Sequence, residues 1–286
     1  MDVRFWGVRG SIPTPGPSTV EIGGNTSCVE VRVGGRLLIF DGGTGLRNLG
    51  NELMKQLPVE AWIFFSHVHW DHIQGFPFFT PAFVRGNTFH LHGGRKVSGT
   101  LESALAGQME NPSFPVHLTE MGANMTFHDL YEGEVMEIPA ISGEAGGGEE
   151  MIRISNARGN HPDGVLAYRV DYRGKSMVYA TDTEHYAVVD PKLKKLAAGC
   201  DLLVYDSQYT PEEYAGEASG GPKLGWGHST FAEAVKLAKV AGARQLVLYH
   251  HDPGQDDAAV REKERRAREL FPNSLAAYEG LTLRVQ

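Results

Sequence analysis

Cysteine is scarce in this sequence. The chain of 286 residues has two, Cys28 and Cys200, which is too few for a disulfide scaffold in a chain of this length. The opening residues, MDVRFWGVRGS, lack the basic segment and the apolar run of a secretory signal. We therefore expect a reducing, cytoplasmic compartment, in which both cysteines are small buried hydrophobic residues.

Long hydrophobic runs and clusters of basic residues are also missing. Apolar stretches such as Ala61–Phe65 fall far short of the ~20 residues that cross a bilayer, so we expect no membrane segment. Acidic side chains number 35 against 27 basic ones, for a formal charge of -8. Nucleic-acid binding relies largely on neutralising phosphates with Lys and Arg, so we do not expect nucleic acid as a partner. A small anionic substrate fits this charge if metal ions supply the positive field.

Glycine, by contrast, is abundant, and its 35 residues separate short apolar runs, which indicates tight turns between strands. Apolar runs predict strands at Cys28–Val33, Arg36–Phe40, Ala61–Ser66, Thr88–His92, Leu166–Tyr172, Ser176–Thr181, Leu202–Asp206, Gln245–Tyr249 and Leu281–Val285. Helical periodicity predicts helices at Leu46–Gln56, Leu101–Gln108, Pro191–Ala198, Phe231–Ala241 and Ala258–Leu270. Strands come early and late with helices between them, which favours an α/β fold with two sheets flanked by helices. A single doubly wound sheet is the alternative.

The densest group of reactive side chains follows the predicted strand Ala61–Ser66. It reads Ser66-His67-Val68-His69-Trp70-Asp71-His72. In an extended segment, residues two apart point to the same side, so His67 and His69 can hold one ion, and a turn after Trp70 directs the last two side chains to a second position. This motif therefore predicts two adjacent metal sites.

Further polar side chains stand at strand ends or in turns marked by glycine and proline. They are His161, Asp182, His228 and His250. A lone histidine before a turn is more often structural, but these residues and the motif together supply what a two-ion site needs. A two-ion site requires roughly three protein ligands per ion, a bridging carboxylate and an open position for water.

These motifs resemble the metallo-β-lactamase fold superfamily. The pattern is His67-x-His69-x-Asp71-His72 followed by His161, Asp182 and His250. Gly227-His228-Ser229-Thr230 is similar to the ribonuclease Z-like and phosphodiesterase branch. The resemblance covers nearly the whole chain and implies that residues 1–286 form a single hydrolase domain, an αββα sandwich of two mixed sheets.

The resemblance also implies the metals and their ligands. It places two divalent ions at the edge between the sheets. Histidine and carboxylate ligands without a cysteine suit Zn²⁺, which we expect, but also Mn²⁺ or Fe. Position by position, the first ion takes His67, His69 and His161, the second takes Asp71, His72 and His250, and Asp182 bridges them. It suggests a homodimer as well.

His228 precedes the predicted helix Phe231–Ala241. Thr230, followed three residues later by a glutamate, forms a capping-box pattern, so His228 stands beside a helix N-terminus that favours anions. The rival interpretation is a histidine of the capping turn. In the ribonuclease Z pattern a glutamate orients this histidine, and here the shorter Asp206 stands at that position, either as its partner or as an ordinary strand-end residue.

The candidate metal ligands together with His228 imply hydrolysis of a phosphodiester through a metal-bridging hydroxide. We expect Asp71 or Asp182 to orient the hydroxide, and His228 with Asp206 to protonate the departing oxygen. Ribonuclease Z enzymes bind transfer RNA through a protruding basic arm that this sequence lacks, so we expect a small phosphodiester such as a cyclic nucleotide. The alternatives are a ribonuclease Z-like transfer RNA 3′ processing endonuclease, a lactone or thioester hydrolase, and a non-catalytic metal-bearing sensor.

Several further residues each have two interpretations. Asp41 either orients a ligand histidine or forms the turn after its strand. His185 and His251 either touch the substrate or are structural. The segment Tyr209–Trp226 is either an active-site lid or a surface excursion, and Ser142–Glu150 is expected to be an irregular loop.

Overall fold

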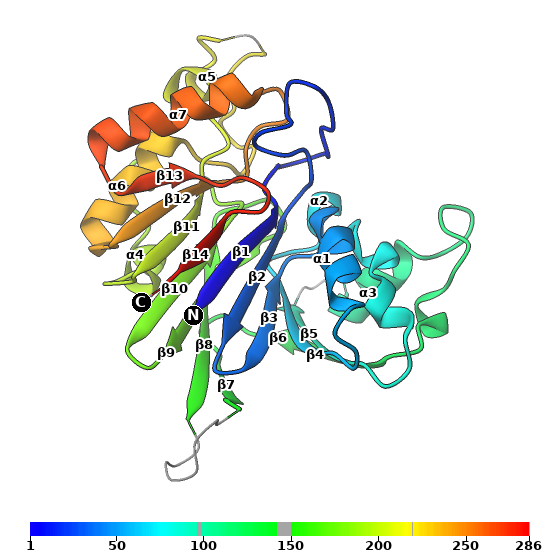
Figure 1. Ribbon diagram of the computed structural model, residues 1–286. Helices are drawn as coiled ribbons and strands as arrows, with labels where there is room; N and C mark the ends of the chain where they lie inside the picture. The colour runs from blue at the N-terminus through cyan, green and yellow to red at the C-terminus, as the bar shows by residue number, and fades with distance from the viewer. Residues whose placement is uncertain (96–98, 142–149, 219, 286) are drawn as a thin grey trace.

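The computed structural model describes residues 1–95, 99–141, 150–218 and 220–285, and in this part of the chain two seven-stranded sheets face each other (Figure 1). In spatial order the first sheet contains β14 (Thr282–Arg284), β1 (Asp2–Gly7), β2 (Cys28–Val33), β3 (Arg36–Phe40), β4 (Glu60–Phe65), β5 (Thr88–Gly94) and β6 (Asn124–Leu130). The second contains β13 (Ser274–Ala276), β12 (Gln245–Tyr249), β11 (Leu202–Asp206), β10 (Lys175–Ala180), β9 (Val165–Tyr172), β8 (Met151–Gly159) and β7 (Val135–Pro139). Parallel and antiparallel pairs occur in both sheets.

Helices cover the outer faces of the two sheets. They are α1 (Gly45–Leu53), α2 (Trp70–Ile73), α3 (Leu101–Gly107), α4 (Pro191–Leu196), α5 (Pro211–Ala215), α6 (Phe231–Ala241) and α7 (Asp257–Leu270), with short 3₁₀ turns at Phe76–Phe78, Thr80–Phe83 and Leu118–Glu120. α1 and α3 pack on the first sheet, and α4, α6 and α7 pack on the second. This arrangement confirms the predicted αββα sandwich and excludes the doubly wound sheet. None of the described helices has both the length and the apolar character that a bilayer crossing requires.

The main core lies between the sheets, and two further cores lie under the helices. On β4, Phe64 belongs to the core between the sheets while Ile63 and Phe65 belong to the core under α1 and α3. A strand that is buried on both faces reads as a continuous apolar run, which is why β4 was predictable. In the central core, Phe40 of the first sheet packs against Tyr168 and Tyr179 of the second, with ring centroids 5.8 and 5.5 Å apart.

All of the predicted strands and helices are present, but several strands were missed. The missed strands are β1, β6, β7, β8 and β13. β6 and β7 leave many side chains exposed, so polar residues interrupt their apolar pattern. Residues 142–149 of the loop expected at Ser142–Glu150 lie outside the described residues.

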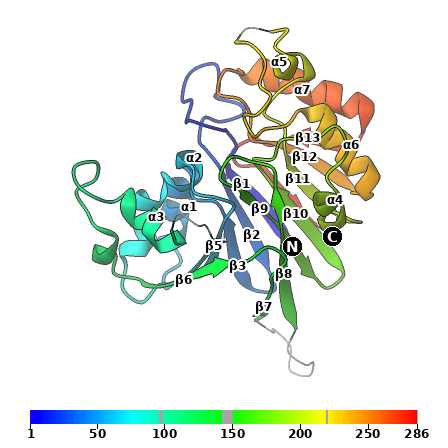
Figure 2. The same cartoon turned by 180° about the vertical axis from the view of Figure 1, so that it is seen from behind.

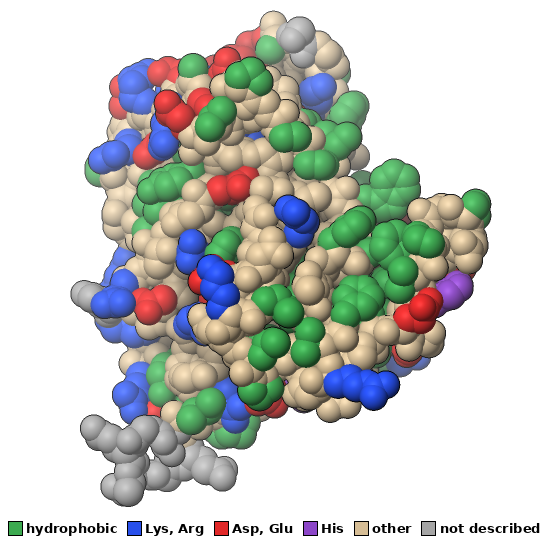
Figure 3. Space-filling model, turned by 45° about the vertical axis from the view of Figure 1, so that its right-hand side comes forward, with side chains coloured by type: hydrophobic (Ala, Val, Ile, Leu, Met, Phe, Trp, Pro, Cys, Tyr) green, Lys and Arg blue, Asp and Glu red, His purple; other side chains and the backbone are tan. Residues whose placement is uncertain are grey.

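Exposed hydrophobic side chains gather over the region of α1 to α3, where they fill much of the right half of Figure 3. The large ones on this part of the chain include Trp70, Phe78 and Phe83, which are 79%, 57% and 37% exposed. Trp70 lies inside the histidine motif, so this apolar surface begins directly beside the reactive side chains.

Candidate metal centre

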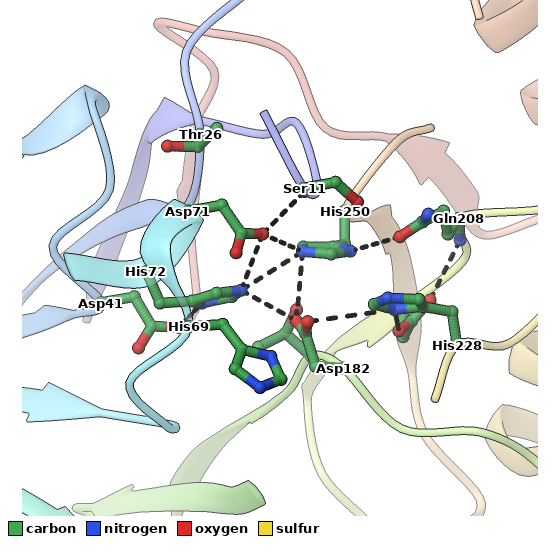
Figure 4. Close-up of polar contacts among 12 residues, drawn as sticks. Ser11, Thr26, Asp41, His69, Asp71, His72, Asp182, Gln208, His228 and His250 are labelled. Carbon is green, nitrogen blue, oxygen red and sulfur yellow. Dashed lines mark hydrogen bonds and ion pairs between the residues drawn. The ribbon is translucent and has the colours of Figure 1, made fainter. Parts of the chain in front are cut away.

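The predicted site residues meet at one edge of the sandwich, where strands of both sheets end (Figure 4). The histidine motif follows β4, His161 follows β8, Asp182 follows β10 and His250 follows β12. Because parallel neighbouring strands end at the same edge of a sheet, residues far apart in sequence come together here.

Left-handed backbone turns direct three of the polar side chains at this edge. Asp41, Asp182 and His250 follow β3, β10 and β12, and their φ angles are 61°, 51° and 61°. Such a conformation costs a non-glycine residue about 1 to 3 kcal/mol. Strain of this kind is retained where the surrounding structure fixes a side chain for function.

The first cluster contains His67, His69 and His161, and one nitrogen from each lies within 4.8 Å of the others. The Nε2 atom of His161 stands 3.0 Å from Nδ1 of His69, and its Nδ1 donates a hydrogen bond of 2.8 Å to the Gly227 carbonyl. The Nε2 atom of His67 is buried and has no hydrogen-bond partner among the described residues. Burial, with His72 close by, lowers the pKa of His67, which leaves a neutral imidazole with a free lone pair.

The second cluster contains Asp71, His72, Asp182 and His250, all of them buried. The Nε2 atoms of His72 and His250 are only 3.3 Å apart. Oδ1 of Asp182 lies 3.2 Å from both nitrogens, and Oδ2 of Asp71 lies 3.2 and 3.1 Å from them. Four donor atoms therefore converge on one small volume.

Asp182 stands between the two clusters. Its Oδ1 faces the second cluster, while its Oδ2 lies 3.8 Å from Nε2 of His67 and 3.9 Å from Nε2 of His161. A carboxylate that turns one oxygen to each cluster has the geometry of a bridging ligand.

Hydrogen bonds behind the clusters fix the imidazoles. Oδ2 of Asp41 accepts from Nδ1 of His72 at 2.8 Å, so the structure supports the orienting interpretation of Asp41. Gln208 accepts from Nδ1 of His250 at 2.9 Å, and the Ser11 amide donates to Asp71 at 2.7 Å. Sequence reasoning missed Gln208 and Ser11, because each meets the site only through the tertiary fold.

The donor set fits two divalent cations. Imidazole nitrogens and carboxylate oxygens with no thiolate suit Zn²⁺, Mn²⁺ or Fe. Without cations, a buried imidazole nitrogen of His67 is left unpaired, and an unpaired buried polar group costs free energy. The family and the cluster together imply divalent metal binding.

His228 and Asp206 form a pair beside both clusters. Nδ1 of His228 lies 3.0 Å from Oδ2 of Asp206, and the ring centroids of His161 and His250 are 5.1 and 5.0 Å from that of His228. Burial opposes the charge, but Asp206 outweighs it and raises the pKa of His228 to about 9. Thr230 caps α6 as expected, by accepting from the Glu233 amide at 3.3 Å.

The remaining candidates separate into two groups. His251 is fully buried and its Nε2 contacts the Ala277 carbonyl at 3.0 Å, so it is structural. His185 contacts Ser229 at 3.1 Å, next to His228. The segment Tyr209–Trp226, of which residue 219 is not described, contains α5. It is fastened by the buried Glu184, which accepts hydrogen bonds from Tyr214 and from the amides of Gly225 and Gly227.

Comparison with known proteins gives consistent matches. The family model for the Beta-lactamase superfamily domain matches residues 36–251. Ribonuclease Z of Bacillus subtilis is 25% identical, over 100% of this chain and 99% of its own. The crystal structure of the short form of human tRNase Z superposes with a TM-score of 0.64 and 19% identity over 100% of both chains. A diphosphatase of the PhnP family gives 0.68 and 17%, over 100% of this chain and 98% of its own.

These matches correct one expectation. We did not expect nucleic acid as a partner, because the chain carries a net charge of -8 and no basic cluster. Full-length similarity to proteins named Ribonuclease Z contradicts that expectation. The reasoning failed because net charge averages over the whole surface, whereas binding depends on the local field, to which metal ions also contribute.

Proposed function

The chain belongs to the beta-lactamase superfamily, and on this premise we propose that it is a two-metal phosphodiesterase that acts on RNA. The resemblance predicted from the sequence is confirmed, and the chain is a hydrolase of this fold. We further propose that residues 1–286 form one hydrolase domain, since β1 and β14, from the two ends of the chain, pair in the first sheet.

The observation that carries the proposal is the His228–Asp206 pair beside the ligand clusters. With a pKa of about 9, the His228 imidazole is protonated at neutral pH. It stands 3.9 Å from Asp182, the residue that faces both clusters. A proton donor at this position suits a departing alkoxide oxygen, which a phosphodiester releases on hydrolysis.

Each residue then has a definite task. The first ion would be held by His67, His69 and His161, the second by Asp71, His72 and His250, with Asp182 shared. When bound, the ions would supply a low-pKa water and neutralise charge on the phosphate. Asp71 or Asp182 accepts a hydrogen bond from the attacking water and orients it. His228 gives its proton to the leaving oxygen, while Asp206 holds Nδ1 and keeps the ring in place.

RNA is supported as the substrate by the full-length similarity to proteins named Ribonuclease Z. A small phosphodiester such as a cyclic nucleotide is the second candidate, and the observation that favours it is a cavity of about 900 Å³ beside the first ligand cluster, a size that encloses a small ligand. For the metal we propose zinc, because nitrogen and carboxylate ligands suit it well.

Metal analysis combined with turnover tests the proposal. The purified protein should contain about two ions per chain, as a two-metal site requires. It should cleave a precursor transfer RNA and bis(p-nitrophenyl) phosphate. His228→Ala should keep its metal and lose activity by roughly 100-fold or more, the scale of a general acid. Hydrolysis of a lactone but no phosphodiester, or an unchanged rate in His228→Ala, would refute the proposal, and cleavage of cyclic nucleotides but no RNA would favour the second candidate.

A further inference from the structure

A cavity of about 900 Å³ adjoins the first ligand cluster. Its lining includes His67 and His161 from that cluster, together with Arg95 after β5 and Arg158 on β8. β5 and β9 contact each other in this region, which can be followed from behind in Figure 2. A volume of this size holds a nucleotide-sized ligand, so a substrate whose scissile phosphate lies at the metal centre can extend into the cavity.

Neither arginine of the cavity has a carboxylate within ion-pair distance among the described residues, although Glu132 lies close enough to Arg158 for the two charges to interact. The Arg95 guanidinium lies over the ring of Tyr131, 5.4 Å from its centroid, and donates to its hydroxyl. Within the described part of the chain, the Arg158 guanidinium interacts electrostatically with Glu132 without a direct ion pair. It lies against Gly164, where an added Cβ would stand 2.5 Å from Nη2. A side chain at position 164 would therefore displace this guanidinium, and the φ of +83° independently favours glycine there.

The local charge differs from that of the whole protein. Two carboxylates line the cavity, Glu132 and Asp163. Glu132 is paired with Lys192, outside the lining, at 2.5 Å, so with Lys192 included three cationic side chains stand against two carboxylates at this place. In an acidic protein, two guanidiniums without a direct ion pair beside the metal centre favour an anionic ligand there.

The remaining walls suit a nucleoside. Leu101, Leu130 and Val165 line the cavity with apolar surface. A pocket with apolar walls and a few placed cations fits a sugar and base that carry a phosphate. Arginine binds phosphate through two parallel hydrogen bonds.

We propose that this cavity binds a second phosphate group of the substrate, next to the scissile one, with Arg158 as its main contact and Arg95 as the supporting one. The inference rests on the proposed function and narrows it, because the preferred substrate then carries at least one phosphate beyond the bond that is cut. A neighbouring phosphate in an RNA chain and a terminal phosphate of a small phosphodiester share this chemistry.

Matched substrates test the inference in the metal-loaded protein. UpU, its 5′-phosphorylated form, its 3′-phosphorylated form and a short oligouridylate differ in the phosphates next to the scissile bond. At least one phosphorylated dinucleotide should exceed UpU in kcat/KM by about tenfold, mainly through a lower KM. Arg158→Gln should abolish this advantage and Arg95→Gln should reduce it. Arg153→Gln is the matched control, an exposed arginine on the same strand that does not line the cavity.

A binding measurement separates this inference from the proposed function. Calorimetry on the metal-loaded protein should show uridine 3′,5′-bisphosphate binding about tenfold more tightly than either monophosphate, with the difference lost in Arg158→Gln. If no phosphodiester is cleaved but the bisphosphate still binds more tightly than the monophosphates, the proposed function fails and the phosphate subsite in the cavity is supported. Equal binding of bisphosphate and monophosphates, or a difference that Arg158→Gln leaves intact, overturns the subsite. If only a terminal phosphate raises kcat/KM, the phosphate-binding cavity serves small substrates. If the oligouridylate shows an equal rise in kcat/KM, the cavity serves RNA.

Discussion

Several imidazoles of the centre are oriented by an acceptor behind the Nδ1 atom, whereas His69 turns its own Nδ1 to the first cluster. Asp41 faces His72, and Gln208 faces His250. The Ser66 hydroxyl uses its proton on Asp41 and therefore accepts from Nδ1 of His67. With Nδ1 fixed as a donor, Nε2 presents its lone pair to a cation, the arrangement that ligand histidines need.

The pKa of His228 leads to a prediction on pH dependence. Asp206 raises this pKa to about 9, so a rate that needs the protonated imidazole should fall as pH rises through about 9. Asp206→Asn removes the charge that stabilises the imidazolium, and the fall should move towards pH 6.5, the ordinary value. The measurement is the pH profile of kcat on bis(p-nitrophenyl) phosphate. An unchanged profile in the variant, with metal content intact, would remove His228 from the role of proton donor.

Gly10 allows a second prediction. A Cβ at this position would stand 2.4 Å from Cε1 of His250 and 2.9 Å from Oε1 of Gln208. Gly10→Ala should displace His250 and weaken metal binding by roughly 10- to 100-fold, the usual cost of disturbing a ligand's support. Gly16→Ala is the control, because nothing lies within 4 Å of its added Cβ. Metal titration of both variants makes the comparison, and equal affinities would contradict the steric argument.

The contiguous part of the site was accessible from spacing alone, whereas the dispersed residues were candidates from their places at strand ends and turns, and their assignment to each ion came from the resemblance. His67, His69, Asp71 and His72 stand within one heptapeptide, whose spacing alone indicates metal binding. Gln208, like Ser11 and Glu184, acts through contacts that the fold creates, and its local sequence carries no metal-binding signal. Arg158 was missed for a similar reason, since it is an exposed residue of β8 and only the fold places it in the wall of the cavity.

At the scale of secondary-structure elements, α7 supports the site from behind. Its buried Lys263 donates to the carbonyls of Ser207 and Gln208, at 2.6 and 3.3 Å, and to the Gln255 side chain at 2.7 Å. These bonds fix the chain immediately after β11, where Gln208 turns towards His250. A helix far from the histidine motif thus holds one of its supporting residues.

Lys263 carries a prediction on stability. Burial lowers its pKa from 10.5 to about 7, so between those values the unfolded chain binds more protons than the folded chain, and stability rises with pH. Lys263→Met leaves buried acceptors unpaired and should cost about 2 to 4 kcal/mol of unfolding free energy. It should also remove this rise between pH 7 and 10. Urea unfolding across that range is the measurement, and a rise of equal size in the variant would show that Lys263 is not its source.

The missed strands show what pattern reading detects. β4, β11 and β12 are buried on both faces and read as apolar runs, so they were predicted closely. β6 and β7, which were missed, leave many of their side chains exposed to solvent. A half-exposed strand is held by backbone hydrogen bonds to its neighbouring strands as much as by side-chain packing. Backbone hydrogen bonds leave no apolar pattern in the sequence.

At the scale of the whole molecule, three tyrosines join the two sheets. The hydroxyls of Tyr168, Tyr179 and Tyr249, all in the second sheet, donate to Phe65, Asp41 and Gly7 of the first layer, at 2.7, 2.7 and 2.8 Å. All three rings are fully buried in the central core. The polar edge that holds the site is therefore coupled to the packing of the sandwich.

Replacement of these tyrosines separates stability from metal binding. Tyr168→Phe and Tyr179→Phe should each lower the unfolding free energy by about 1 to 2 kcal/mol, the cost of a lost buried hydrogen bond. Tyr179→Phe should also weaken metal binding, because Tyr179 contacts the same Asp41 oxygen that orients His72. Tyr168→Phe lacks that connection and should keep its metal affinity. The prediction fails if both variants bind metal equally, as measured alongside urea unfolding.

The pairing of β1 with β14 has a practical consequence. The Val285 amide donates to the Met1 carbonyl at 2.9 Å, and the two ends of the chain lie side by side in Figure 1. β1 then runs about 20 Å at its usual rise per residue before the chain reaches Ser11 at the metal centre. A few glycines could join residues 285 and 1 into a ring without disturbing the sandwich. A tether on either residue would hold the molecule to a surface with the edge that carries the candidate metal centre turned to the solution.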